Sequence, residues 1–327
     1  MNGTLTAFRA ACAIGLLAFS TVGAAQQAYP NKPIRIIVPA APGGAFTLLA
    51  RLVGDHLTKA WGVNVLTDNR PGAGAVIGTQ AMVKSAPDGY TVLVVGPTHT
   101  INAVLLPNAP YDSIRDFAAV ATLADTQPMI VARTSLPADS LQNFITLLKR
   151  DPGKFNYAST GGASSSTYLY GAYFSILTGT QSTTITYNGS GPVLVALLAG
   201  QVDFFITPPA GYIESIKAGR LKALAVGGNV RFNSLPDTPT LAEAGLPAFQ
   251  LKGWYGVLAP AATPRPIIDK LSAEIAVMLK RPETREFLSK QELAPFITSP
   301  EEFSAFLKAD VASYAKIVKE ANIKPGE

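Results

Sequence analysis

The stretch that decides the fold is residues 33–60, PIRIIVPAAPGGAFTLLARLVGDHLTKA. It starts with a short β-rich run at 34–38, passes through a Pro/Gly loop at 39–45, and continues as a helical stretch from 47 to 60 that Thr47 can cap. A strand that turns through glycine into a helix is the opening of a βαβ unit. This stretch therefore predicts an α/β fold.

The same alternation continues along the chain. Further strands are expected at 63–66, 91–95, 156–159, 182–187, 202–206 and 221–226. Further helices are expected at 79–84, 141–149, 191–199, 267–280 and 300–320, and a glycine-rich loop at 71–78. Strands that alternate with helices of this length favour a largely parallel sheet.

The length favours two lobes. A chain of 327 residues is longer than one hydrophobic core usually serves. The composition changes near 121–133, where we expect the chain to cross into a second lobe, and the strand expected at 254–258 marks its return. The predicted limits are 26–124 with 254–327 for lobe 1, and 125–253 for lobe 2.

The first 25 residues have the layout of a secretory signal peptide. One positive charge, Arg9, precedes an uncharged apolar run at 10–24 that ends in small residues. The run is shorter than the roughly 20 residues that span a bilayer, so we expect cleavage after Ala24 or Ala25 and a periplasmic protein; the alternative is a buried N-terminal helix. The one cysteine, Cys12, lies in this segment, so the mature chain is expected to have no disulfide and no thiol chemistry.

The charge of the chain is mildly positive. The net charge is +5, and the charged residues are scattered rather than grouped in blocks. Such a surface suits the attraction of anionic solutes, although solubility alone explains it equally well. No run of Lys and Arg lies beside aromatic residues, so a nucleic-acid partner is not expected.

Three loops, at 42–47, 96–100 and 159–166, share one design. Each follows a strand, is small and polar, and opens a helix. In open α/β sheets, ligands bind beyond the carboxyl ends of strands, where the unpaired N–H groups of helix N-termini receive anions without Lys or Arg. Each loop alone also fits an ordinary capped turn. Their occurrence in both predicted lobes favours a cleft that binds an anion.

Enzyme templates find little support. The chain has two histidines, and no Gly-x-Ser-x-Gly elbow accompanies His99, which lies in one of the three loops. Two histidines without a cysteine disfavour a zinc site, and neither a dinucleotide nor a Walker glycine pattern occurs. We therefore expect no enzyme, no metal and no cofactor. A periplasmic hydrolase that uses His99 as its base stays open as an alternative.

Two strings of the sequence are specific to one family: Asn-Arg-Pro-Gly-Ala-Gly at 69–74 and Ala-Pro-Asp-Gly-Tyr-Thr at 86–91. Further strings of the same family pattern lie at 33–39, 42–44, 110–112, 156–159, 187–189, 198–203, 222–226, 235–240 and 254–256. Together they resemble the Bug family, the periplasmic receptors of tripartite tricarboxylate transporters, and the resemblance covers nearly the whole mature chain.

This resemblance implies a Venus-flytrap fold, type II-like, in which crossing strands join two α/β lobes and a small organic carboxylate binds in the cleft. It implies a monomer that delivers its ligand to the permease subunits of a transporter; a sensory module that presents the ligand to a membrane sensor kinase is the alternative. The expected ligand-binding residues come from the three loops and from strand ends of lobe 2: Gly43, Gly44, Ala45, Phe46, Thr47, Thr98, His99, Ser159, Gly161, Ser164, Ser165, Tyr168, Tyr187, Asn188, Gly189 and Thr207.

Two departures from the family pattern bear on the ligand. Thr47 stands where the family usually has Asp, which disfavours an amino-acid ligand because a partner for its ammonium group is missing. Tyr168 stands where the family tends to have His, and the sequence leaves open whether Thr167 or Tyr168 faces the cleft. Phe46 and Tyr168 can form an apolar wall suited to an aromatic or bulky acid, or can simply pack against neighbouring helices. An aromatic or dicarboxylic acid is therefore the favoured ligand.

Overall fold

The structure is a computed structural model that describes residues 29–163, 165–320 and 322–323. It divides the chain into the segment Met1–Asn31 and the compact unit Lys32–Glu327, and the fold described below belongs to the second. The predicted signal peptide lies outside the described residues. None of the described helices combines the length and apolarity that a membrane crossing needs.

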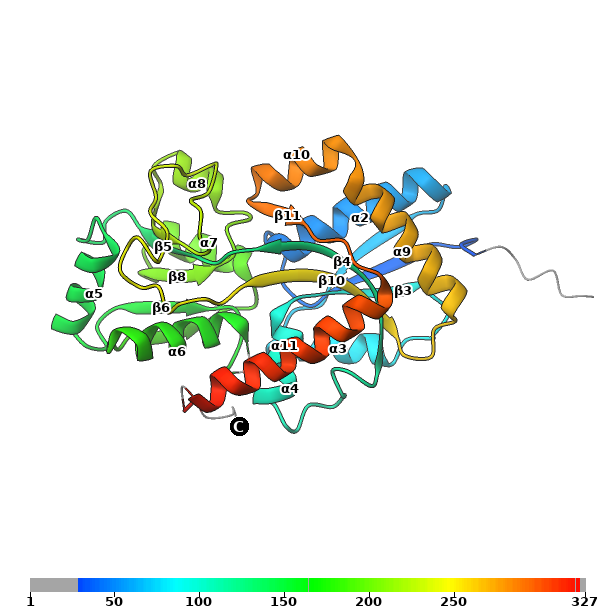
Figure 1. Cartoon of the computed structure of the whole chain (residues 1–327), viewed down its shortest axis with the longest axis horizontal. Coiled ribbons are helices and arrows are strands. Elements are labelled where there is room, and N and C mark those ends of the chain that lie inside the picture. The colour runs from blue at the N-terminus through cyan, green and yellow to red at the C-terminus, as the bar shows by residue number, and fades with distance from the viewer. Residues whose placement is uncertain (1–28, 164, 321, 324–327) are drawn as a thin grey trace, which may run out of the picture. The chain divides into compact units, whose positions relative to one another are not determined.

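Two sheets organise the compact unit (Figure 1). The first has the order β11-β4-β10-β3-β1-β2 and consists of β1 (Ile34–Val38), β2 (Val65–Asn69), β3 (Thr91–Val95), β4 (Phe117–Thr126), β10 (Gly253–Pro260) and β11 (Leu293–Pro295). The second has the order β7-β6-β8-β5-β9 and consists of β5 (Met129–Arg133), β6 (Asn156–Ser159), β7 (Thr183–Thr186), β8 (Phe204–Thr207) and β9 (Leu221–Val226). Each sheet is the centre of one lobe.

Helices cover both sheets. In lobe 1 these are α2 (Ala45–Trp61), α3 (Val76–Val83), α4 (Pro97–Leu105), α9 (Arg265–Lys280), α10 (Pro282–Lys290) and α11 (Pro300–Glu320). In lobe 2 they are α5 (Leu141–Arg150), α6 (Ser166–Thr178), α7 (Ser190–Leu198) and α8 (Ile213–Lys217). The predicted two-lobed α/β fold is confirmed.

The prediction of a largely parallel sheet is wrong, because both sheets are mixed. β1 is parallel to β2 and β3, whereas β10 is antiparallel to both β3 and β4. In lobe 2, β6 is parallel to β7 and β8, whereas β5 is antiparallel to β8 and β9. The cause is the connection between the lobes: the chain leaves lobe 1 through β4 and returns through β10, so these neighbouring strands must run in opposite directions (Figure 1).

The first strand of the sequence, β1, is an inner strand of the lobe 1 sheet, between β3 and β2. The side chains of Ile34, Ile36, Ile37 and Val38 are fully buried, as expected for a strand covered on both faces of its sheet. The strand predicted at 91–95 is also found at those residues.

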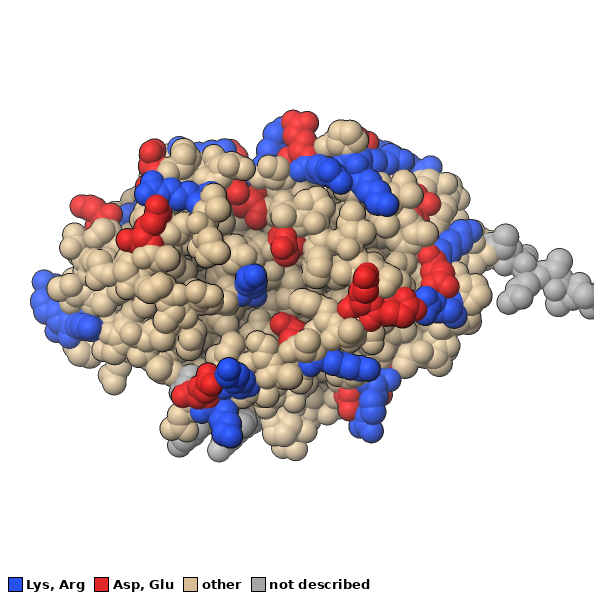
Figure 2. All heavy atoms as spheres, in the orientation of Figure 1, with Lys and Arg blue, Asp and Glu red and all other residues tan. Residues whose placement is uncertain are grey.

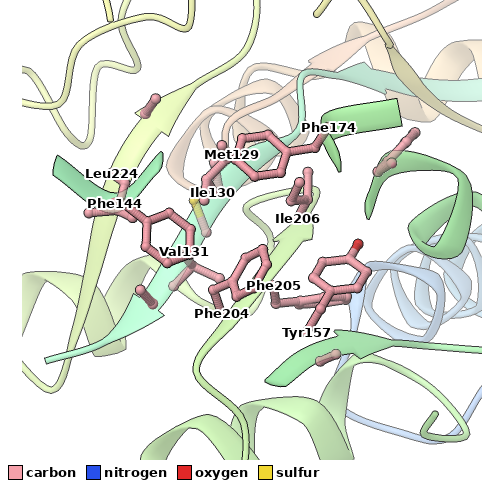
Figure 3. Close-up of a cluster of buried hydrophobic side chains, with 14 of the residues drawn as sticks. Met129, Ile130, Val131, Phe144, Tyr157, Phe174, Phe204, Phe205, Ile206 and Leu224 are labelled. Atoms are coloured by element: carbon pink, nitrogen blue, oxygen red, sulfur yellow. The ribbon is translucent and has the colours of Figure 1, made fainter. Parts of the chain in front are cut away.

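The core of lobe 2 is rich in aromatic side chains, which Figure 3 shows on both sides of the central strands. The rings of Phe144 and Phe204 meet edge to face with centroids 4.8 Å apart, and Tyr157 lies 5.0 Å from Phe204. Edge-to-face and tilted packing of this kind adds to the free energy gained by burial. The core therefore fixes β6 and β8, whose C-terminal ends lead to the site.

Two helices of lobe 1 extend into this core. Ile101 and Leu105 of α4, with Tyr314 and Val318 of α11, are buried in the same hydrophobic cluster as the lobe 2 residues. The two lobes therefore share apolar contacts beside the crossing strands as well as across the site.

Candidate functional site

The first predicted loop leads into α2, whose N-terminus carries no side-chain cap. Gly44 is the N-cap residue, and Gly43 before it has a φ of 101°, in the left-handed region that favours glycine. Thr47, predicted to cap the helix, lies within its first turn, where Oγ1 accepts a hydrogen bond from Asn69 Nδ2 at 2.9 Å. That prediction is wrong because the hydroxyl is used inside lobe 1. No side chain among the described residues caps the first N–H groups of α2.

The second predicted loop opens α4 in the same way. Its N-cap residue is Gly96, Pro97 takes the first helical position, and no side chain caps the terminus. Thr98 reaches the other lobe: its Oγ1 donates a hydrogen bond to Ser166 Oγ at 3.1 Å and accepts one from Ser166 N at 3.2 Å. Thr98 therefore joins α4 to the first residue of α6.

His99 lies in the interior of lobe 1. Its ring is parallel to that of Tyr111 and meets Phe117 edge to face at 4.8 Å between centroids. Burial lowers the pKa of His99 to about 4, so the ring is neutral, and Nε2–H donates to the carbonyl oxygen of Ser113 at 2.8 Å. Nδ1 has no hydrogen-bond partner within the described part of the chain. The structure does not bring His99 together with the other predicted site residues.

Hydrogen bonds within the third predicted loop, 159–166, fix its shape. Ser159 Oγ donates to the carbonyl oxygen of Gly161 at 2.7 Å and lies 3.1 Å from Ser165 Oγ. Ser165 is the N-cap residue of α6 and accepts a hydrogen bond from Tyr168 N. The N-terminus of α6 is therefore capped by its own serine. Ser164 lies outside the described residues.

The two residues that the sequence left open, Thr167 and Tyr168, differ in their surroundings. Thr167 is buried, and its Oγ1 accepts a hydrogen bond from Thr160 N at 2.8 Å and lies 3.3 Å from Ser159 Oγ. Tyr168 is half-buried. Thr167 thus belongs to the internal hydroxyl network of the loop, which leaves Tyr168 as the residue of this pair with solvent-accessible surface.

Lobe 2 contributes another uncapped N-terminus, that of α7. Its N-cap residue is Gly189, with a φ of 132° and no side-chain cap. Tyr187 N donates to the carbonyl oxygen of Ser159 at 2.8 Å, which ties this segment to the serine-rich loop. The carbonyl oxygen of Asn188 accepts a hydrogen bond at 2.8 Å from the backbone N–H of Ala41, in the loop before α2. This is a direct backbone hydrogen bond between the lobes.

Glycines from the two lobes lie against each other. A Cβ atom added to Gly43 would lie 3.1 Å from Cα of Gly191, and one added to Gly211 would lie 3.0 Å from the carbonyl oxygen of Gly43. A Cβ atom on Gly161 would lie 2.9 Å from Cα of Gly74. The lobes are therefore in direct backbone contact, and the N-termini of α2 and α7 lie next to each other.

The turn between α10 and β11 forms a further contact between the lobes, here called the α10–β11 latch. Glu292 has a φ of 53°, and its Oε1 accepts hydrogen bonds from Ser234 N at 2.6 Å and Ser234 Oγ at 2.5 Å. Gln291 Oε1 accepts a longer one from Gly211 N at 3.4 Å. A left-handed backbone conformation is unfavourable for a residue other than glycine, so the surrounding structure must stabilise it. At Glu292 the hydrogen bonds from Ser234 to the carboxylate do so.

Sequence reasoning missed several residues that make the contacts between the lobes: Ala41, Ser190, Gly191, Gly211, Gln291 and Glu292. The Pro-Pro-Ala-Gly turn at 208–211 was a detectable signal, because it follows a strand in the manner of the three selected loops. The latch residues carry no such signal, since a short polar turn after a helix is common. Thr207, which was predicted, is buried at the end of β8 and pairs with Met129.

The electrostatics of the site come from the backbone. The segments 41–47, 96–100, 159–166 and 187–191 contain no Lys or Arg. Each helix N-terminus carries roughly half a positive charge, and no side chain caps those of α2, α4 and α7. This arrangement can accept an anion through N–H groups, glycine backbone and hydroxyls.

Metal chemistry finds no support in the described residues, where no three His, Cys, Asp or Glu side chains are grouped to hold an ion. Figure 2 shows Lys and Arg side chains mixed with Asp and Glu side chains, mainly around the edge of the face in view, and uncharged residues over most of the rest. A broad field of one sign, as a nucleic-acid surface needs, is not present on that face.

Comparisons with known proteins agree with this geometry. Residues 49–323 match the family described as "Tripartite tricarboxylate transporter family receptor". The chain is 35% identical over 298 residues to "Protein BugT" of Bordetella pertussis, covering 90% of this chain and 91% of that protein. The solved structure of the periplasmic binding protein BugD has a TM-score of 0.87 at 29% identity, covering 90% of this chain and 99% of the other. An R. palustris protein solved with adipate also has a TM-score of 0.87 at 29% identity, covering 91% and 100%.

The family match spans most of the chain, and the relatives and structures match it over nearly their whole lengths. The resemblance to the Bug family is therefore confirmed, and with it the expectation of a solute receptor rather than an enzyme. The chain belongs to the family of tripartite tricarboxylate transporter receptors.

Proposed function

We propose that this protein captures a small organic carboxylate between its lobes in the periplasm and delivers it to the permease of a tripartite tricarboxylate transporter. One observation carries the proposal: the N-termini of α2 and α7 lie next to each other in the contact between the lobes, and their N-cap residues are glycines that supply no side-chain cap. Two positive helix ends repel each other when they meet. An anion held between them converts that repulsion into attraction on both sides.

Closure then depends on the ligand. The interaction of an anion with one helix N-terminus is worth about 0.3–1 kcal/mol at an exposed site and up to about 2 kcal/mol when partly buried. An anion between α2 and α7 gains this from both lobes only when they are closed. The ligand therefore shifts the protein toward the closed form, which is the form that a permease can distinguish from the empty receptor.

The predicted ligand-binding residues divide into two groups under this proposal. The backbone around Gly43 and Gly44 and the hydroxyl of Thr98 serve lobe 1, and the segment from Tyr187 to Gly189 serves lobe 2. Ser159 and Ser165 support the shape of the serine-rich loop, because their hydroxyls bond within it. His99 has no direct part, since its ring lies against Tyr111 and Phe117.

The lobe limits 26–124 with 254–327 and 125–253, and the cleavable signal peptide at 1–25, are part of the same proposal. The division of the strands supports the limits, because the first sheet takes its strands from 34–126 and 253–295 and the second from 129–226. Relatives that are periplasmic binding proteins support the location.

A thermal-shift screen of the mature protein tests the function. Benzoate, adipate and succinate are compared with benzylamine and glucose at equal ionic strength, since salt itself screens helix ends. A ligand at a hundred times its dissociation constant adds about 2.7 kcal/mol to the stability of the folded state. We expect large shifts from carboxylates alone. Shifts from the amine or the sugar, with none from any acid, would rule the function out.

A further inference from the structure

We propose that Phe46 determines the ligand class, and that it makes the protein select monocarboxylates with a flat, unsaturated body over flexible dicarboxylates. The inference deepens the proposed function and rests on it. Phe46 lies in the first turn of α2, beside the N-terminus whose backbone N–H groups would receive the carboxylate of the ligand.

Phe46 is the second residue of α2, two positions after the uncapped N-cap residue Gly44. Its ring meets that of Tyr255 edge to face, with centroids 5.2 Å apart and planes at 87°. Tyr255 is buried in the crossing strand β10, whereas Phe46 is half-buried. The two rings therefore form an apolar wall that extends from the first turn of α2 to β10, one of the two strands that cross between the lobes.

The same ring reaches the start of α4. A Cβ atom added to Gly96, the N-cap residue of that helix, would lie 3.0 Å from Cζ and 3.3 Å from Cε1 of Phe46. The ring thus lies beside both uncapped N-termini of lobe 1. Carbon atoms therefore occupy space next to the second terminus, where a second carboxylate directed at α4 would lie.

The chemistry of the ring selects between ligands. The face of an aromatic ring carries partial negative charge and its edge partial positive charge, so a second carboxylate against the face is repelled. An aromatic body held by a carboxylate at α2 instead gains edge-to-face or offset contact with Phe46 and loses apolar surface to water. One carboxylate with a flat apolar body fits this wall; two carboxylates on a flexible chain do not.

The test is isothermal titration of benzoate and adipate into the wild type, Phe46→Ala and Phe46→Leu. Phe287→Ala, at an exposed phenylalanine of α10, is the matched control for losing a phenyl ring elsewhere. We expect the wild type to bind benzoate at least about tenfold more tightly than adipate. Phe46→Ala should weaken benzoate binding about tenfold and adipate binding little, with Phe46→Leu between them because it restores apolar area without a ring.

The outcomes separate the inference from the function. If adipate binds the wild type as tightly as benzoate, or if Phe46→Ala weakens both acids equally, Phe46 does not set the ligand class and the receptor function stands. If no carboxylate of the screen binds the wild type, the proposed function fails and the inference fails with it. The unfolding temperature of each variant, measured without ligand, shows whether a loss of affinity reflects a loss of folding.

Discussion

One methyl group can block a close backbone contact between the lobes. Gly191 is the second residue of α7, and a Cβ atom placed there would overlap the carbonyl oxygen of Pro42 and lie 3.3 Å from Cα of Gly43. The backbone of Gly191 is not in the left-handed region, so alanine fits its conformation. Because the obstructing atoms belong to the other lobe, Gly191→Ala should oppose closure and leave each lobe intact.

The size of the effect follows from the contact. Non-bonded heavy atoms prefer a separation of about 3.5–4.0 Å, so the backbone of the two lobes would have to move apart by roughly 1.5 Å at this point. Overpacking of this kind typically costs about 1–3 kcal/mol, which lowers the equilibrium constant for closure by about 5- to 150-fold. A ligand that binds only the closed form should lose affinity by up to the same factor.

Titration calorimetry with the acid that gives the largest thermal shift measures the affinity, and small-angle scattering measures compaction on adding that acid. Gly162→Ala is the matched control, because a Cβ atom there meets nothing within 4 Å and the residue belongs to a loop of the same lobe. Without ligand, Gly191→Ala should unfold at the same temperature as the wild type or slightly higher, since alanine favours a helix over glycine. Unchanged affinity and normal compaction in Gly191→Ala would refute the reasoning.

Three further changes test other parts of the structure. Thr98→Val removes the hydroxyl that bonds Ser166 across the lobes, so ligand binding should weaken by about 0.5–1.5 kcal/mol in calorimetry; an equal loss of stability without ligand would contradict a role in closure. Ser234→Ala removes one of the two hydrogen bonds to Glu292 and should weaken benzoate and adipate binding by the same small factor; a change in their ratio would place the latch in ligand selection. The pKa of His99 is lowered from 6.5 to about 4, so between these pH values the unfolded chain binds a proton that the folded chain does not, and stability falls as the pH falls. His99→Gln should remove up to about 3 kcal/mol of this pH dependence in urea unfolding at pH 4 to 7, and a variant with the wild-type slope would contradict the buried neutral ring.

The sequence predicted those features that local patterns determine. The run at 34–38 is β1 and the run at 91–95 is β3, because an apolar stretch of that length bounded by Pro, Gly or Asp has few other structures available. The loops were found because glycine and hydroxyl residues between a strand and a helix signal an open helix end. Thr47 shows the limit of this reasoning, because a threonine near a helix start caps it unless a distant partner, here Asn69, takes the hydroxyl.

The contacts between the lobes could not be predicted in this way. Gly191 lies in a predicted helix, and no sequence pattern marks Glu292, because the role of each residue depends on which segment of the other lobe lies opposite. The mixed sheets also depend on tertiary pairing. Local alternation of strands and helices predicts parallel strands, but β10 returns beside β4 in the antiparallel direction. Tertiary pairing, rather than residue type, decides all three.

The free energy of lobe closure contains terms of opposite sign, and a bound anion changes one of them. Three groups of hydrogen bonds favour closure: Ala41 to Asn188, Thr98 with Ser166, and the α10–β11 latch. Each bond contributes about 0.5–1.5 kcal/mol, because water satisfies the same groups in an open form. The apposed N-termini of α2 and α7 oppose closure, and an anion between them reverses the sign of that term. The anion thereby adds to the hydrogen bonds that favour the closed form, so N–H groups in segments that contain no Lys or Arg can still hold a charged ligand.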